Sequence, residues 1–146
     1  MVLTTDQKGA IAEAAIACAA IKLGVGVFKP LSDGERYDLI LDLRPQLVRV
    51  QCKTAVRRGS VLAIPCYSAR RSPRGFLKRL YSSAEIDAIA AYCADLDRCF
   101  FIPFDEIPGR TCLQLRLSPA RNGQRSGVNW GDDFAFDARL TALLGP

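Results

Sequence analysis

The feature that most constrains the fold is a pair of short segments in which apolar and polar residues alternate, at residues 37–43 and 47–54. A period of two is typical of β-strands that bury one face. Arg44-Pro45-Gln46 lies between the segments and favours a turn. The sequence therefore predicts a β-hairpin across residues 37–54.

The alternation also assigns side chains to faces, because successive residues of a strand point to opposite sides. The predicted core face holds Tyr37, Leu39, Leu41, Leu43, Val48, Val50 and Cys52, and the predicted polar face holds Asp38, Ile40, Asp42, Arg49, Gln51 and Lys53. We expect the register in which Asp42 lies opposite Arg49 and Asp38 opposite Lys53, since a slip of one residue would bury the charges.

The polar face contains groups that can bind a hard cation. Asp38 and the side-chain carbonyl of Gln51 offer the oxygen ligands that Mg²⁺ prefers. Lys53, two residues further along the same face, can hold or deprotonate a metal-bound water, or neutralise charge on a phosphate. On spacing alone, a merely solvated polar face explains the same residues equally well.

The same residues carry a family resemblance. Asp38, followed by Gln51-Cys52-Lys53 on the next strand, resembles the signature of the PD-(D/E)XK nucleases. More narrowly, the chain resembles the branch that includes group I intron-encoded homing endonucleases, from Lys8 to about Phe136. The segments that carry this narrower resemblance are Tyr37-Asp38-Leu39, residues 50–55, residues 81–85 with Asp87, Phe101-Ile102-Pro103, Leu115-Arg116-Leu117 and Asn122-Gly123-Gln124. The chain departs from the broad superfamily at Arg36-Tyr37, where a Pro often precedes the Asp, and at Gln51, which replaces an acid.

The resemblance implies a restriction-endonuclease-like α/β core, with a mixed, mostly antiparallel sheet flanked by an N-terminal helix and short helices. It also implies a Mg²⁺-dependent endodeoxyribonuclease, with Mn²⁺ as a possible substitute. By resemblance, Asp38, Gln51 and the backbone carbonyl of Cys52 would bind the metal. Lys53 would orient the nucleophilic water, and Glu13 would assist the metal or its water shell.

Two other functions fit the same fold. The first is a Holliday-junction resolvase or a repair nuclease, since this fold serves many DNA transactions. A catalytically silent DNA-binding module is also possible, because an amide at Gln51 weakens the negative charge that holds Mg²⁺. For an active nuclease, one site per domain predicts a homodimer or homotetramer, in which partner sites cut both strands.

Composition narrows the chemistry. A length of 146 residues predicts one domain, residues 1–146, and 49% hydrophobic with 24% charged residues is ordinary for a globular protein. No signal peptide or long apolar segment is evident, so we expect a cytoplasmic protein without membrane contact. Six cysteines without a CxxC pair do not favour zinc. The absence of histidine excludes Ser-His and Cys-His catalysis, which leaves carboxylates, lysine and metal.

Positive charge is concentrated in one part of the chain. The net charge is +5, yet residues 44–84 hold ten Lys or Arg and not one Asp or Glu. Such a segment predicts a surface that meets a polyanion, here double-stranded DNA. Pro73 and Gly75 predict that residues 70–79 form a mobile basic loop, and residues 122–127 a polar loop, although ordinary solvated loops fit both segments. The predicted DNA-binding residues are Arg57, Arg58, Arg70, Arg71, Arg74, Lys78, Arg79, Asn122 and Gln124.

Local signals predict the remaining elements. Thr4 and Gln7 form a capping-box pattern that starts a helix, and we expect that helix to end near Leu23, before Gly24. Further strands are expected at residues 25–30, 61–66, 86–94, 99–104 and 111–117, although residues 88–91 could equally be helical. We expect residues 130–144 to cover an open sheet edge or to form an interface.

Overall fold

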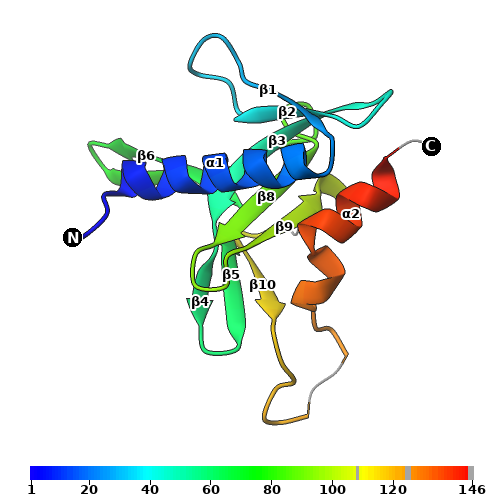
Figure 1. The fold of residues 1–146 in the computed structure, drawn as a ribbon. Coiled ribbons are helices and arrows are strands. Elements are labelled where there is room, and N and C mark those ends of the chain that lie inside the picture. The colour runs from blue at the N-terminus through cyan, green and yellow to red at the C-terminus, as the bar shows by residue number, and fades with distance from the viewer. Residues whose placement is uncertain (108, 124–125, 145–146) are drawn as a thin grey trace.

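The computed structural model describes residues 1–107, 109–123 and 126–144. Within these described residues, two α-helices, two short 3-10 helices and ten strands follow one another (Figure 1). In order they are α1 (Thr5–Lys22), β1 (Gly26–Phe28), β2 (Leu39–Asp42), β3 (Leu47–Thr54), β4 (Val56–Arg58), β5 (Val61–Pro65), β6 (Tyr67–Ser72), β7 (Gly75–Leu80), β8 (Ala88–Cys93), β9 (Arg98–Pro103), η1 (Phe104–Glu106), β10 (Cys112–Arg116), η2 (Gly131–Phe134) and α2 (Phe136–Leu143).

Helix α1 begins at the predicted capping box. The backbone N–H of Gln7 donates to Oγ1 of Thr4 at 3.1 Å, and the N–H of Thr4 donates to Oε1 of Gln7 at 2.9 Å. The helix ends at Lys22, and Gly24 follows with a positive φ of 78°. Small and apolar side chains let the helix pack closely on the sheet, and its buried residues are Ala12, Ile16 and Ala20. The predicted helix is confirmed.

The central sheet has five strands in the order β1-β2-β3-β8-β9. Strands β3 and β8 pair in parallel, and every other neighbouring pair is antiparallel. Helix α1 crosses the face of β3 and β8, and α2 packs on β9 (Figure 1). The mixed, mostly antiparallel sheet flanked by an N-terminal helix and short helices is therefore confirmed.

The register of the β2–β3 hairpin differs from the prediction by two residues. Leu39 pairs with Val50, and Asp42 pairs with Leu47 rather than with Arg49. The cause is the turn, in which Leu43 N–H donates to the Gln46 carbonyl at 2.8 Å and so centres the hairpin between residues 44 and 45. A shift of two residues preserves which side chains share a face, so the inward-facing residues of β2 and β3 are still those predicted.

The sheet is buried on both faces, whereas we expected one core face and one polar face. One cluster lies between the sheet and the helices and includes Ile16, Leu41 and Val50. A second cluster lies on the opposite face, where β5 and β10 contribute Leu62 and Leu115. Strands β5, β10 and β4 form their own three-stranded antiparallel sheet on that side.

Tyr37 also departs from its predicted position. It packs against the second cluster, on the face opposite Leu39. The alternation breaks because β2 begins only at Leu39, and Asp38 occupies a bend just before it.

The basic segment predicted as a mobile loop is a regular hairpin. Strands β6 and β7 pair antiparallel from Tyr67 opposite Leu80 to Ser72 opposite Gly75. Oγ of Ser72 accepts from the N–H of Arg74 at 3.3 Å and donates to the Gly75 carbonyl at 2.8 Å, and Gly75 has a φ of 106°. The Pro and Gly that indicated disorder are thus confined to the turn.

The C-terminal segment covers the edge of the sheet beside β9. Ala135 forms a β-bridge with Phe100, while Phe136 and Leu140 are buried in the first cluster. This agrees with the predicted covering of an open edge. Within the described residues, no helix has the length and apolarity needed to cross a membrane.

Candidate active site

Asp38 lies at the bend before β2 and contacts β3 twice. Its backbone N–H donates to the carbonyl of Val50 at 2.8 Å. Its Oδ2 accepts from the backbone N–H of Cys52 at 2.9 Å. These two hydrogen bonds fix the carboxylate beside the strand that carries Gln51 and Lys53.

A cavity of about 140 Å³ opens beside Asp38 and also contains Glu13 of α1. The rest of its lining comes from Lys29, Tyr37 and, in the β1–β2 connection, Pro30 and residues 32–35. Nζ of Lys29 lies 2.6 Å from Oε1 of Glu13. The fold thus brings together Glu13 and Asp38, which the sequence placed on separate elements.

The negative charge of Glu13 disfavours a negative charge on the neighbouring carboxyl group of Asp38. Burial raises the pKa of Asp38, and the nearby charge of Glu13 raises it further, whereas the hydrogen bond from Cys52 opposes the shift. The hydrogen bond to Glu13 raises the pKa of Lys29, whose side chain is 69% exposed. An exposed lysine forms a weak ion pair that a stronger cation can displace.

Lys53 extends from β3 on the face opposite Cys52. Its Nζ donates to the backbone carbonyl of Tyr67 at 2.7 Å and lies 5.2 Å from the ring centroid of Tyr81. Burial lowers the pKa of Lys53, while the charge of Asp38 opposes that shift. The ammonium is therefore a half-buried proton donor close to the carboxylate.

The residues predicted to bind or assist the metal come from three places, namely β3, the bend before β2, and α1. Gln51 is half-buried and, by alternation, shares the face of Lys53. Cys52 packs against the first cluster, and burial raises the pKa of its thiol, so its contribution to a site is its backbone carbonyl. Glu13 approaches from α1, and the cavity that it lines includes neither Gln51 nor Lys53.

The donor set fits a hard divalent cation. Among the described residues, no three His, Cys, Asp or Glu side chains form a cluster that would hold a metal. The predicted set needs only one of these side chains, because an amide and a backbone carbonyl supply the remaining oxygens. The raised pKa of Asp38, due to burial and to Glu13, marks a site where a cation would relieve unfavourable negative charge.

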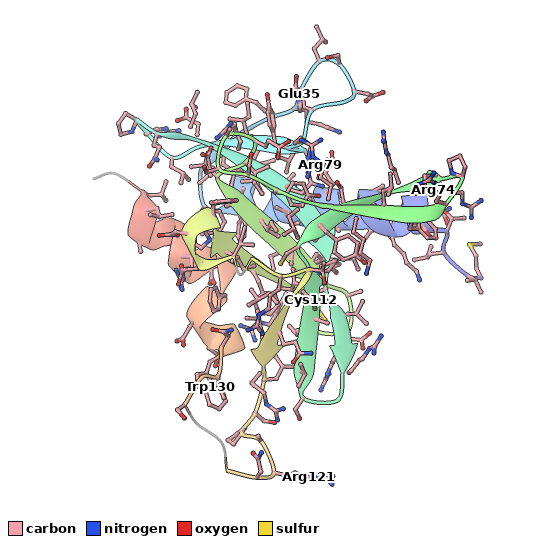
Figure 2. All side chains as sticks on the ribbon, turned by 180° about the vertical axis from the view of Figure 1, so that it is seen from behind. Glu35, Arg74, Arg79, Cys112, Arg121 and Trp130 are labelled. Atoms are coloured by element: carbon pink, nitrogen blue, oxygen red, sulfur yellow. The ribbon has the colours of Figure 1, made fainter. Side chains whose placement is uncertain are left out.

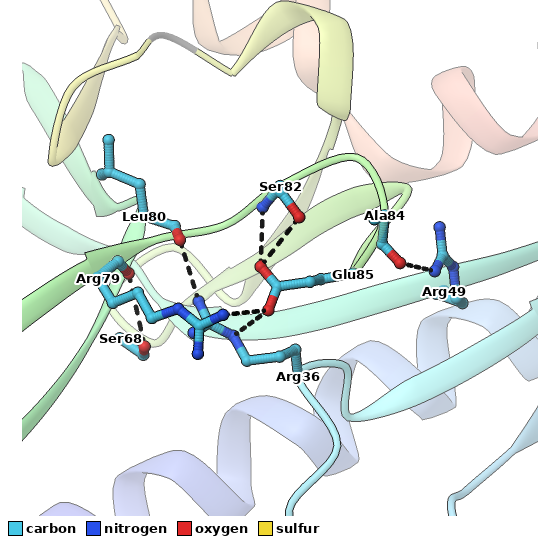
Figure 3. Close-up of polar contacts among 8 residues, drawn as sticks. All are labelled: Arg36, Arg49, Ser68, Arg79, Leu80, Ser82, Ala84 and Glu85. Carbon is cyan, nitrogen blue, oxygen red and sulfur yellow. Dashed lines mark hydrogen bonds and ion pairs between the residues drawn. The ribbon is translucent and has the colours of Figure 1, made fainter.

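A network centred on Arg36 and Glu85 adjoins the site, and no sequence pattern assigned a role to it (Figure 3). The Arg36 guanidinium lies 4.3 Å from the ring centroid of Tyr81, and its Nη2 donates to the carbonyl of Leu80 at 3.3 Å. Glu85 lies 3.5 Å from Nε of Arg36 and 3.0 Å from Nη2 of Arg79. Burial raises the pKa of Tyr81 to about 12. Arg36 and Tyr81 lie outside the strands, so periodicity gave no signal for them.

The predicted DNA-binding residues fall into two places. Five lie on the β6–β7 hairpin, namely Arg70, Arg71, Arg74, Lys78 and Arg79. Arg57 and Arg58 lie on β4 of the second sheet, where Arg58 and Asn122 line a common cavity of about 550 Å³. The ends of β4 and β5 and the β6 hairpin point in different directions (Figure 1). Gln124 lies outside the described residues.

Comparison with known proteins agrees with this geometry. The model of the family described as PD-(D/E)XK endonuclease matches residues 3–137. The solved structure of a bacterial homing endonuclease, I-Ssp6803I, is similar, with a TM-score of 0.76 and 26% identity over 95% of this chain and 93% of that one. No curated protein matches. Because the family model spans nearly the whole chain, this protein belongs to the PD-(D/E)XK endonuclease family.

Proposed function

We propose that this protein is a Mg²⁺-dependent endodeoxyribonuclease that hydrolyses phosphodiester bonds in double-stranded DNA, in the manner of a homing endonuclease. Membership of the nuclease family supports the reaction class, and nucleases of this family generally use divalent metals. The observation that carries the proposal is the position of Asp38, held by Cys52 beside the strand of Gln51 and Lys53 and sharing a cavity with Glu13.

Each residue has a distinct part in this proposal. Asp38, the Gln51 side chain and the Cys52 carbonyl would hold Mg²⁺, with Mn²⁺ as a substitute. When bound, such an ion activates water and stabilises negative charge on a phosphate. The Lys53 ammonium would orient the attacking water and offset charge on the phosphate in the transition state. Glu13 would give up its ion pair with Lys29 and instead contact the metal or its water shell.

The assembly follows from the number of sites. One candidate site per chain can cut one strand at a time, and symmetric oligomers bring a second site to the other strand. We therefore propose a homodimer or homotetramer. Sedimentation of the free protein and of its DNA complex measures this directly.

The test is cleavage of supercoiled plasmid with Mg²⁺, with Mn²⁺ and with EDTA. We expect nicked and linear products only with metal. Asp38→Asn and Lys53→Ala should each reduce the rate by at least roughly 10²-fold while retaining DNA binding. Lys22→Ala, at the exposed last turn of α1, is the control for loss of a positive charge. Cleavage in EDTA, or full activity in both site variants, would refute the proposal.

A catalytically silent DNA-binding module is the second candidate. Its support is the uncharged amide at Gln51 together with the Glu13–Lys29 ion pair, in which Lys29 already neutralises Glu13. The same assay separates the two functions, since a silent module would bind the plasmid without cutting it under any metal condition.

A further inference from the structure

The β6–β7 hairpin stands apart from both larger sheets. It forms a two-stranded sheet of its own, and every residue of β7 is exposed. Figure 2 shows the hairpin extending from the body of the protein, with Arg74 near its far end and Arg79 closer to the body. An isolated two-stranded ribbon is only marginally stable in water, so a partner that covers it would stabilise it.

The charge of the hairpin indicates the chemistry of that partner. Residues 67–80 contain five Lys or Arg and no Asp or Glu. Arg79 is paired with Glu85, whereas Arg70, Arg71, Arg74 and Lys78 form no ion pair with the described part of the chain. A surface of unpaired positive charge is complementary to a polyanion such as DNA.

The two faces of the hairpin differ. On one face Arg71 lies opposite Phe76, and the Arg71 guanidinium is 5.7 Å from the ring centroid of Phe76. Lys78 shares this face and lies 4.8 Å from the ring of Tyr67. The other face holds Arg70 and Arg79, and Arg79 turns to Glu85 of the body (Figure 3). The Arg79–Glu85 pair therefore joins the face of Arg70 to the body, whereas the described residues show no ion pair between the face of Arg71 and the body.

The shape of the hairpin suits one groove of DNA. The major groove is about 12 Å wide and admits a two-stranded β-ribbon, whereas the minor groove is only about 6 Å wide. Strands of six residues extend for about 20 Å, enough to follow the groove beyond one base pair. Resting on the proposed nuclease function, we propose that the β6–β7 hairpin lies in the major groove and that Arg71 contacts the edge of a guanine.

Arg71 is suited to this contact for two reasons. A cation–π contact with Phe76, which is 67% exposed, favours one position of the guanidinium while leaving its N–H edge available. A restrained guanidinium matches O6 and N7 of guanine with two parallel hydrogen bonds, which is the commonest specific contact in the major groove. Lys78 carries a point charge that suits a phosphate rather than a base edge.

The first experiment selects DNA in EDTA, so that binding is measured without cleavage. The probe is a pool of duplexes with a random central segment, and the bound fraction is sequenced. We expect the wild-type protein to enrich sequences with a fixed guanine. Arg71→Lys keeps the charge but loses the bidentate pair of hydrogen bonds. The preference for that guanine should therefore fall by about tenfold or more. Arg44→Lys, the same change at an exposed position in the β2–β3 turn, should leave the preference intact.

The second experiment replaces the preferred guanine by 7-deazaguanine, which lacks the N7 acceptor in the major groove. Binding by the wild-type protein and by Arg44→Lys should weaken by roughly tenfold, whereas binding by Arg71→Lys should hardly change. Circular dichroism of each variant checks that the fold is retained.

The outcomes separate this inference from the proposed function. DNA binding without sequence preference, or a preference that persists in Arg71→Lys, overturns the inference and leaves the nuclease proposal standing. A preference that 7-deazaguanine does not affect also overturns it. Failure to bind any DNA refutes both.

Discussion

Asp38 combines a structural role and a candidate catalytic role in one side chain. Its carboxylate takes the place of a backbone acceptor for the N–H of Cys52, just before β2 begins. Asparagine can still accept that hydrogen bond while carrying no charge. Asp38→Asn therefore removes the proposed ligand charge without leaving a half-buried N–H unpaired, which an alanine would do.

Gln51 is the residue at which the chain departs from the commoner acid of the family signature, and Gln51→Glu tests it directly. A carboxylate here adds a negative charge beside the proposed metal. A unit charge about 4 Å away contributes at most about 4 kcal/mol at an effective dielectric constant of about 20, and desolvation removes part of this. We expect Mn²⁺ affinity to rise by roughly tenfold or more, measured by isothermal titration calorimetry.

Gln46→Glu in the β2–β3 turn is the matched control, because it adds the same charge at the opposite end of the hairpin from Asp38. It should leave metal affinity nearly unchanged. An equal response in both variants, or none in Gln51→Glu, would show that the side chain at position 51 does not face the metal.

At the scale of elements, a set of hydrogen bonds between Arg49 and Asp87, here called the clamp, joins β3 to the segment before β8. The N–H, Nε and Nη2 of Arg49 all donate to the carboxylate of Asp87, at 2.8–3.0 Å. Arg49 also donates to the carbonyls of Ala84 and Ser83. This clamp secures the start of the parallel β3–β8 pairing, where Val50 lies beside Ala88.

Asp87→Asn should destabilise the protein, because the charged hydrogen bonds weaken. Charge-assisted hydrogen bonds are worth about 1.5–3 kcal/mol, and partial exposure of this pair reduces the expected loss to about 1–2 kcal/mol. The hydrogen bonds from Arg49 lower the pKa of Asp87, so its stabilisation is present above pH ~4 and is lost as pH falls through the lowered pKa. Urea unfolding should show the largest difference from wild type near neutral pH and a shrinking one in acid.

Asp95→Asn, in the exposed β8–β9 turn, is the control for Asp87→Asn. It should not change the pH dependence of unfolding. A constant gap between Asp87→Asn and wild type at every pH would contradict the electrostatic account of the clamp.

The charge of the β6–β7 hairpin predicts how DNA affinity depends on salt. Replacing Arg70, Arg71, Arg74 and Lys78 by Gln removes up to four positive charges that can face DNA, while it keeps the Arg79–Glu85 pair. The slope of log affinity against log salt should flatten by about 0.9 for each phosphate that the variant no longer neutralises, so by about two to three units in total. Fluorescence anisotropy on a random-sequence duplex measures this slope, and an unchanged slope would place the DNA elsewhere.

Local signals in the sequence predicted the elements better than their pairing. The capping box fixed the start of α1, and alternation identified β2 and β3. The hairpin at residues 67–80 was missed because Pro73 and Gly75 break strands in general, yet here they lie only in the turn. The contacts of Glu13 with Lys29 and of Lys53 with Tyr67 join distant segments, so no local pattern could indicate them.

On the scale of the whole molecule, the two core clusters share their strands. Ala88 and Ala90 of β8 belong to the first cluster, and Ile89 and Ala91 to the second. Neither cluster can lose its packing without exposing the other face of β8. We therefore propose that the chain is one domain and predict a single cooperative unfolding transition.

Two probes report on the two sides of the sheet. Far-UV circular dichroism follows α1 and α2, which pack on the first cluster. Trp130, the only tryptophan of the chain, forms a β-bridge with Arg116 of β10, on the side of the second cluster. The urea midpoints from ellipticity and from tryptophan fluorescence should coincide, and separate midpoints would indicate two independently folding parts.

The hydrogen bond from Lys53 to the Tyr67 carbonyl limits how this scaffold can be retargeted. Exchanging the hairpin for that of a relative would alter the backbone on which the candidate catalytic ammonium rests. The second anchor, from Arg36 to the carbonyl of Leu80, lies directly across from Tyr67, at the same open end of the hairpin. A transplant that replaces only the residues from Ala69 to Lys78 leaves both anchors in place. It would exchange the DNA-recognition residues and keep the hydrogen bond of Lys53. A transplant that begins at Tyr67 would change the sequence specificity and the cleavage rate at the same time.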